Sequence, residues 1–212
     1  MHPKQKEVVW TPQLAYAVGL ITTDGCLYPD GRHLAFVSSD KDLIKTFKEC
    51  LVLKNRIVKK RSGYTKQLNS FVIQFGNVTL YRWLIKIGLM PNKSNQLGSL
   101  EIPDEFFFDF ARGLLDGDGS IRKYYDPIYP KSLRLYVSFT GASLPHLLWL
   151  KKKINKLTDT TGFVRKSTRA YRLTFSKKDS INLLNRIYYK SDLPCLNRKY
   201  IIAKDFILSP RW

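Results

Sequence analysis

Two aspartates, Asp24 and Asp118, each follow an apolar stretch and are each followed by a glycine. The segments AYAVGLITTDGCL (residues 15–27) and DFARGLLDGDGSI (residues 109–121) share the pattern G-L-[IL]-x-x-D-G, 94 residues apart. Two carboxylates that meet at one place, together with the carbonyl oxygens at helix ends, are suitable ligands for a hard cation such as Mg²⁺. Such a cation can activate water and stabilise the attacking and leaving oxygens in the in-line hydrolysis of a phosphodiester.

These two segments predict a pair of helices that could pack against each other. Thr11 is a suitable N-cap and Pro12 a suitable first residue for the first helix, and Pro103 with two acidic residues opens the second. Small residues lie inside both helices and would let two helix backbones approach closely: Ala15, Ala17, Gly19, Ala111 and Gly113. If the helices pack in parallel, their C-terminal ends bring Asp24 and Asp118 together.

The aspartates also have a simpler interpretation. Gly25 and Gly119 are typical helix stops, and an aspartate before such a glycine is a common surface turn residue. A single short G-L-x-x-x-D-G segment would favour this interpretation. Two copies at equivalent places in a repeated order of elements favour a shared site instead.

The elements that follow each copy are predicted to occur in the same order. Apolar patterns indicate a hairpin, a helix, a second hairpin and a final helix. In the first half these elements span residues 26–39, 40–51, 56–75 and 79–87, and in the second half residues 120–139, 143–157, 160–175 and 178–189. We therefore predict an α+β fold of two pseudo-symmetric αββαββα halves, residues 1–98 and residues 99–212, with a linker near residues 95–103.

Alternation along the predicted strands separates an apolar face from a polar face. Leu135 and Val137 point to one side, and Arg134 and Tyr136 point to the other. An open face of Arg, Lys, Tyr, Ser and Thr suits a DNA groove, although a polar outer face is also ordinary for an antiparallel sheet. The side chains predicted to bind DNA are Lys59, Arg61, Arg122, Arg134, Tyr136, Arg172 and Thr174. The pattern is less clear in the first half, because Ile57 shares its side of the strand with the first two residues of this list.

The composition indicates a folded protein with a polyanionic partner, as opposed to a merely soluble basic surface. The 212 residues carry 36 Lys and Arg against 17 Asp and Glu, a net charge of +19, and the excess is +6 in residues 1–106 and +13 in residues 107–212. Three cysteines and three histidines, widely spaced, fit neither a disulfide framework nor a zinc site. No apolar run reaches membrane length, so we expect an intracellular protein with no membrane partner.

At the two G-L-[IL]-x-x-D-G segments the chain resembles the LAGLIDADG homing endonucleases, in particular the monomeric branch that carries two motifs in one chain. The copy ARGLLDGDG matches closely, whereas AVGLITTDG departs at Ala17, Val18 and Thr22. The resemblance implies that the motif helices pair at the centre and that the antiparallel sheets form a DNA-binding saddle. It also implies Mg²⁺-dependent cleavage of both strands of a long, pseudo-palindromic site, one aspartate per strand, with Mn²⁺ or Ca²⁺ able to substitute for Mg²⁺ in binding.

The same resemblance assigns residues to the site. The expected metal ligands are the last aspartate of each motif and the backbone carbonyl of the residue before it: Asp24, Thr23, Asp118 and Gly117. The segments GLMPNKSNQL and LPCLNRKYIIA resemble those that carry a basic residue of the catalytic pocket, which places Lys93 and Lys199 there. A lysine near the scissile phosphate could stabilise developing negative charge or polarise the attacking water. The alternative interpretation is that both lysines are solvated loop residues.

Two other functions are compatible with the same scaffold. An RNA-binding intron maturase, or a DNA-binding regulator without cleavage, would keep the helix pair, because helix packing does not require the carboxylates. Retention of both aspartates favours the nuclease, although maturase activity can coexist with an intact site. An intein origin is less favoured, because no splicing block is visible. Under the leading hypothesis the chain is a monomer that takes part in intron homing, encoded by an organelle, a bacterium or a phage, with intron RNA as a second candidate partner.

Overall fold

The computed structural model describes residues 7–61 and 69–207 of the chain. The N-terminal half contains α1 (Pro12–Asp24), β1 (Gly25–Leu27), β2 (His33–Ser38), α2 (Lys41–Cys50), β3 (Ile57–Lys60), β4 (Ser70–Gly76) and α3 (Val78–Lys86). Two short 3₁₀ helices, η1 (Lys93–Asn95) and η2 (Asp104–Phe106), lie in the connection to the C-terminal half. That half contains α4 (Phe107–Gly117), β5 (Ser120–Tyr125), β6 (Leu133–Gly141), α5 (Leu144–Thr158), β7 (Phe163–Lys166), β8 (Tyr171–Phe175), α6 (Lys177–Ile187) and α7 (Asn197–Ile207).

Local capping explains where the helices begin. The Thr11 hydroxyl accepts a hydrogen bond from the Leu14 N–H at 3.1 Å, and Pro12 occupies the first position of α1, where its missing N–H has no cost. Asp40 and Ser143 cap α2 and α5 with their side chains in the same way. Within the described residues, no helix is both long and apolar enough to cross a membrane.

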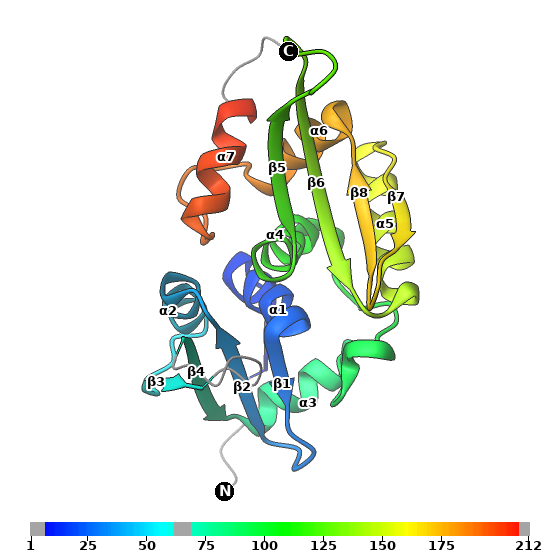
Figure 1. The fold of residues 1–212 in the computed structure, drawn as a ribbon. Helices are drawn as coiled ribbons and strands as arrows, with labels where there is room; N and C mark the ends of the chain where they lie inside the picture. The colour runs from blue at the N-terminus through cyan, green and yellow to red at the C-terminus, as the bar shows by residue number, and fades with distance from the viewer. Residues whose placement is uncertain (1–6, 62–68, 208–212) are drawn as a thin grey trace, which may run out of the picture.

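Each half contains a four-stranded antiparallel sheet. The strand orders are β1-β2-β4-β3 and β5-β6-β8-β7, so the two sheets have matching topologies. One face of each sheet packs against helices, and Figure 1 shows the sheets at opposite ends of the molecule with α1 and α4 side by side between them. This arrangement confirms the predicted α+β fold of two pseudo-symmetric halves joined through the motif helices.

The paired helices α1 and α4 run parallel and in very close contact. The Tyr16 carbonyl lies against Gly113, where an added Cβ would be 2.2 Å from the oxygen. Seven residues further along α1, the Thr23 side chain lies against Gly117, where an added Cβ would be 2.0 Å from Thr23 Oγ1. Because the contacts advance along both helices together, the two C-terminal ends meet at one place.

Three features differ from the expectations. Helix α7 was not predicted, so within the described residues the C-terminal half has one α-helix more than the N-terminal half. Helix α4 begins at Phe107, after the 3₁₀ turn of η2, whereas the sequence suggested a start near Pro103. The second hairpin of the N-terminal half lies partly outside the described residues, because its tip falls in residues 62–68. The boundary between residues 98 and 99 stays a prediction.

Candidate active site and nucleic-acid interface

The ends of α1 and α4 bring Asp24 and Asp118 together. Asp24 Oδ2 lies only 3.1 Å from the position that a Cβ on Gly117 would occupy, so the end of one helix touches the carboxylate of the other. Removal from water raises the pKa of Asp24 to about 6, and the negative charge of Asp118 adds to this rise. Removal from water also raises the pKa of Asp118. Two carboxylates that are costly to ionise together are a suitable place for a cation.

Lys93 and Lys199 occupy equivalent places beside the two aspartates. Lys93 is 7% exposed and donates a hydrogen bond from Nζ to the carbonyl of Gly25, the glycine that follows Asp24. Lys199 is 5% exposed and donates from Nζ to the carbonyl of Gly119 at 2.7 Å. Neither lysine is a solvated loop residue, and each holds the Asp-Gly turn of its own half.

The two lysines differ in how many of their donors are used. Lys199 Nζ also donates to the carbonyls of Leu115 at 2.5 Å and Asp116 at 3.0 Å, so all three of its N–H donors are satisfied by the backbone. Among the described residues, Lys93 donates only to Gly25. Burial lowers the pKa of Lys93, and it lowers the pKa of Lys199 to about 8. Lys93 therefore has N–H donors left for another partner, whereas the charge of Lys199 is held in a fixed position by three carbonyls.

The donor set around the aspartates fits a hard cation. Thr23 and Gly117, whose carbonyls were predicted as further ligands, lie directly before the two aspartates and touch each other across the helix pair. Within the described parts of the chain, no three His, Cys, Asp or Glu side chains are grouped so that they could hold a metal ion. Cations at this place would be held by the carboxylates, by carbonyl oxygens and by oxygens of water or substrate, which is an oxygen-rich set of the kind that Mg²⁺ prefers.

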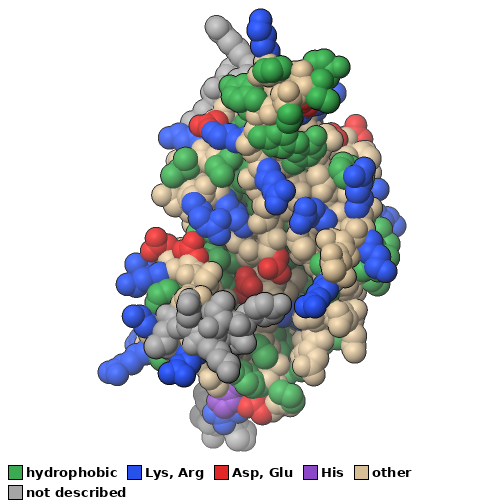
Figure 2. Space-filling model, viewed as in Figure 1, with side chains coloured by type: hydrophobic (Ala, Val, Ile, Leu, Met, Phe, Trp, Pro, Cys, Tyr) green, Lys and Arg blue, Asp and Glu red, His purple; other side chains and the backbone are tan. Residues whose placement is uncertain are grey.

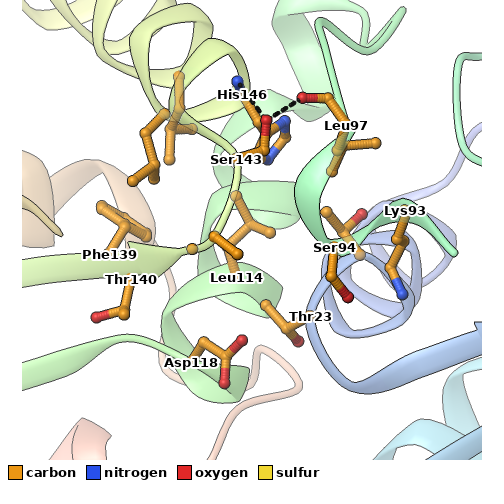
Figure 3. Close-up of a pocket in the computed structure, with 15 residues that line it drawn as sticks. Thr23, Lys93, Ser94, Leu97, Leu114, Asp118, Phe139, Thr140, Ser143 and His146 are labelled. Carbon is orange, nitrogen blue, oxygen red and sulfur yellow. Dashed lines mark hydrogen bonds between the residues drawn. The ribbon is translucent and has the colours of Figure 1, made fainter. Parts of the chain in front are cut away.

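A cavity of about 190 Å³ opens beside this site, between the two halves (Figure 3). Thr23 and Asp118 lie at one end of it and His146 at the other. His146 Nδ1 is 2.8 Å from the carbonyl of Gly98, and the Ser143 hydroxyl donates to the carbonyl of Leu97 at 2.5 Å. The connection between the halves is thus tied to the start of α5.

The open face of the C-terminal sheet carries the predicted DNA-binding side chains of that half. Register pairs Arg122 with Tyr136, and Ser138 with Thr174, so side chains of three neighbouring strands share one face. Arg134, Tyr136, Arg172 and Thr174 alternate with the buried residues of β6 and β8. The same face also carries Tyr124 and Arg165, which were not predicted. Figure 2 shows Lys and Arg side chains spread over this face, with acidic side chains near the middle of the molecule.

The N-terminal sheet requires a correction at Lys59. Ile57 pairs with Ile73 and Lys59 pairs with Phe71, and both partners point toward the helices. Paired residues share a face, so Lys59 lies on the helix side of the sheet, although it is exposed there. Lys60 occupies the open face instead. Arg61 is exposed and directly follows Lys60, the last residue of β3.

Comparison with known proteins agrees with this geometry. No family model and no curated protein matches the chain by sequence. Among solved structures, the homing endonuclease I-WcaI bound to its DNA recognition sequence is 12% identical, with a TM-score of 0.65 over 98% of this chain and 94% of that chain. I-DmoI in complex with its target DNA in the presence of manganese is 17% identical, with a TM-score of 0.55 over 86% and 96% of the two chains. The N-terminal LAGLIDADG domain of DUF199/WhiA is 15% identical, with a TM-score of 0.57 over 89% and 88%.

The chain has the fold of the LAGLIDADG homing endonucleases. Its paired helices are the two motif helices of that fold, and the two sheets take equivalent places on either side of them. The first motif keeps the close helix contact despite Thr22, whose hydroxyl donates to the carbonyl of Val18 within α1 at 2.7 Å. The departure from the motif at this position therefore leaves the helix intact.

Sequence reasoning missed a group of buried polar side chains in the LAGLIDADG helix α4. Asp109 and Arg112 form an ion pair at 2.6 Å, and both are almost completely buried. Asp116 is 1% exposed and accepts a hydrogen bond from the Tyr16 hydroxyl across the helix pair at 2.9 Å. The only signal in the sequence was the presence of charged residues at helical positions that should face the core.

Proposed function

We propose that the chain is a site-specific DNA endonuclease that cuts both strands of a long, pseudo-palindromic duplex in the presence of a divalent cation. The observation that carries this proposal is the meeting of Asp24 and Asp118 at the ends of two parallel helices, each beside a buried lysine that binds the following glycine. A purely structural role for the aspartates would not explain why two carboxylates with raised pKa values are held next to each other.

Under this proposal each aspartate serves one DNA strand. Asp24 with the carbonyl of Thr23 would hold a cation for one strand, and Asp118 with the carbonyl of Gly117 would hold a cation for the other. A divalent cation held there would supply a coordinated water of lowered pKa and a positive charge against the phosphate oxygens. Manganese accompanies one solved structure of the same fold, which supports a divalent cation here as well. We expect Ca²⁺ to support binding.

The two lysines are proposed to stabilise negative charge near the scissile phosphates. A cation placed where charge develops in the transition state lowers the barrier without reorganisation. Lys93 has N–H donors left for a phosphate oxygen or a water. Lys199 is saturated by three carbonyls, so we assign its contribution to its charge and to the fixed shape of the turn that presents Asp118.

The open sheet faces are proposed to form the saddle that binds DNA. Arg side chains on the C-terminal sheet can meet phosphates or guanine edges in a groove. Solved structures of this fold, such as I-WcaI, are bound to their recognition sequences. We propose that the chain acts as a monomer, with residues 1–98 and 99–212 each holding one half-site.

The experiment that tests this function is selection of cleaved members from a library of long DNA duplexes. The chain is incubated with the library and Mg²⁺, and cut ends are sequenced, with an EDTA reaction as the control. We expect a single family of long sites with both strands cut. Tight binding to some members with no cleavage of any member would overturn the nuclease and favour a DNA-binding protein without activity.

An alternative function on this scaffold is binding without cleavage. One neighbour of the same fold is a domain of WhiA, so the fold also occurs outside proteins named as endonucleases. For this chain the alternative includes an RNA-binding intron maturase. A splicing assay with the host intron would separate RNA from DNA as the partner. A test of binding to structured RNA, at salt high enough to suppress non-specific contacts, would do the same.

A further inference from the structure

The helix that carries Lys199, α7, is anchored to α4 through the residue just before its first turn. Asp116 Oδ2 accepts a hydrogen bond from the N–H of Leu196 at 2.8 Å, and Leu196 directly precedes α7. The carbonyl of Leu196 in turn accepts the N–H of Lys199 at 2.9 Å. A single residue, Leu196, therefore connects the Asp116 carboxylate to the backbone of Lys199.

Neighbouring buried groups hold the same stretch of chain in place. Arg112 donates from Nε to the carbonyl of Pro194 at 2.9 Å and from Nη1 to the carbonyl of Ile187 at 2.8 Å. Its charge is balanced by Asp109, which also accepts from the Tyr189 hydroxyl at 3.1 Å. These contacts fix the segment between α6 and α7, so that Leu196 reaches Asp116 in one conformation.

Among the described residues of the N-terminal half, no equivalent of this network occurs. When the motifs are superposed on their common G-L pair, the positions of Asp109, Arg112 and Asp116 correspond to Ala15, Val18 and Thr22. All three N-terminal residues are buried, and the Thr22 hydroxyl donates to the carbonyl of Val18 in its own helix. Lys93 is accordingly held through one backbone carbonyl, whereas Lys199 is held through three carbonyls and through Asp116.

We propose that Asp116 is a positioning residue for Lys199, and that it makes the two active sites unequal. This inference rests on the proposed endonuclease function. Asp116 holds Leu196, Leu196 sets the start of α7, and the start of α7 fixes Lys199 beside Asp118. Cleavage of the strand served by the C-terminal site therefore depends on Asp116, and cleavage of the other strand does not.

The positioning can be tested without DNA by the reactivity of the lysine amines. Acetic anhydride at low concentration, read by mass spectrometry, gives the acetylation rate of Lys199, with Lys93 as the internal control. Asp116→Leu removes the acceptor for the Leu196 N–H, and we expect Lys199 acetylation to accelerate by about tenfold while Lys93 is unchanged. Asp116→Asn keeps an acceptor oxygen and should retain the slow rate. An unchanged Lys199 rate in the leucine variant would overturn the positioning role.

Amide hydrogen exchange of Leu196 in the unmodified chain covers the case in which the leucine variant does not fold. The proposal requires this N–H to be protected, because it is bonded to a buried carboxylate. Exchange at the rate of an unstructured amide would contradict the contact itself and with it the proposal.

The effect on catalysis is read separately on each strand of a labelled duplex target. Lys199→Met first identifies the strand that depends on the C-terminal site. We expect Asp116→Leu to slow that same strand by on the order of 10-fold to 100-fold and to accumulate nicked product, because small misplacements of active-site groups have effects of this size. Asp116→Asn should restore most of the rate, and Thr22→Val, at the equivalent position of α1, should leave both strands unchanged.

The outcomes for the two proposals are distinguishable. Equal slowing of both strands, or slowing of the strand that does not depend on Lys199, would overturn the positioning role while the endonuclease function stands. A chain that cuts no target would contradict the endonuclease function. In that case the acetylation rates still decide whether Asp116 holds Lys199.

Discussion

Gly19 and Gly113 face each other at the crossing of α1 and α4, and neither can carry a side chain. A Cβ on Gly19 would lie 2.8 Å from the Cα of Gly113 and 2.2 Å from the carbonyl of Phe110, and a Cβ on Gly113 would lie 2.9 Å from the Cα of Gly19. The atoms that either Cβ would meet belong to the backbone, which cannot move aside as a flexible side chain can. The contact of the two halves, and with it the meeting of the two aspartates, depends on this glycine pair.

We therefore expect Gly113→Ala to destabilise the chain strongly. Its new methyl group would overlap the carbonyl of Tyr16, and overpacking of this kind typically costs about 1–3 kcal/mol, with more where backbone atoms clash. Urea denaturation followed by circular dichroism measures the change. Gly98→Ala is the matched control, since nothing lies within 4 Å of a Cβ at that position. Equal stability of the two variants would contradict the close helix contact.

The elements of this fold could be predicted from the sequence because their signals are local. Thr11 and Pro12 mark the start of α1, and Asp40 and Ser143 mark the starts of α2 and α5 through side chains that cap their own helices. Helix α7 carries no side-chain cap of this kind. Its first turn is set by a contact between Leu196 and Asp116, which are 80 residues apart, and no local pattern records such a contact.

The candidate site was predictable only in part, for a similar reason. The repeat of the motif, and the resemblance that it carries, indicated Asp24 and Asp118. The face on which Lys59 lies depends on which side of β3 the helices cover, and both Ile57 and Val58 are apolar, so alternation alone could not decide it. The bonds of Lys199 to three carbonyls follow from the tertiary structure.

Replacement of one aspartate should convert double-strand cleavage into nicking. Asp24→Asn or Asp118→Asn keeps the size of the side chain but removes the charge that holds a cation, so the strand served by that site should be cut at least about 100-fold more slowly. DNA binding should change little, because the basic side chains that give the chain its net charge of +19 are unchanged. Gel analysis of a supercoiled target separates nicked from linear product. Loss of binding in either variant would show that the aspartate is structural.

The cleavage rate should have a maximum between about pH 6 and about pH 8. Asp24, with its pKa raised to about 6, becomes protonated as the pH falls below that value, and a protonated carboxyl binds cations poorly. Lys199, with its pKa lowered to about 8, loses its positive charge as the pH rises above that value. Single-turnover rates at a low, fixed Mg²⁺ concentration measure both limbs. Saturating Mg²⁺ should shift the acidic limb to lower pH. An acidic limb whose position does not depend on the cation concentration would contradict the assignment to Asp24.

The two faces of the sheets can be separated by the salt dependence of DNA binding. Arg165 lies on the open face of the C-terminal sheet, opposite Arg172 across β7 and β8, whereas Lys59 lies on the helix side of the N-terminal sheet. If Arg165 meets a phosphate, Arg165→Ala should weaken binding about equally for all sequences and reduce the slope of log K against log salt by about 1. Lys59→Ala removes the same charge from an exposed position and should leave the slope unchanged. The slope of log K against log salt could instead fall by the same amount in both variants. Affinity would then follow net charge, and the open faces would not be the DNA-binding surface.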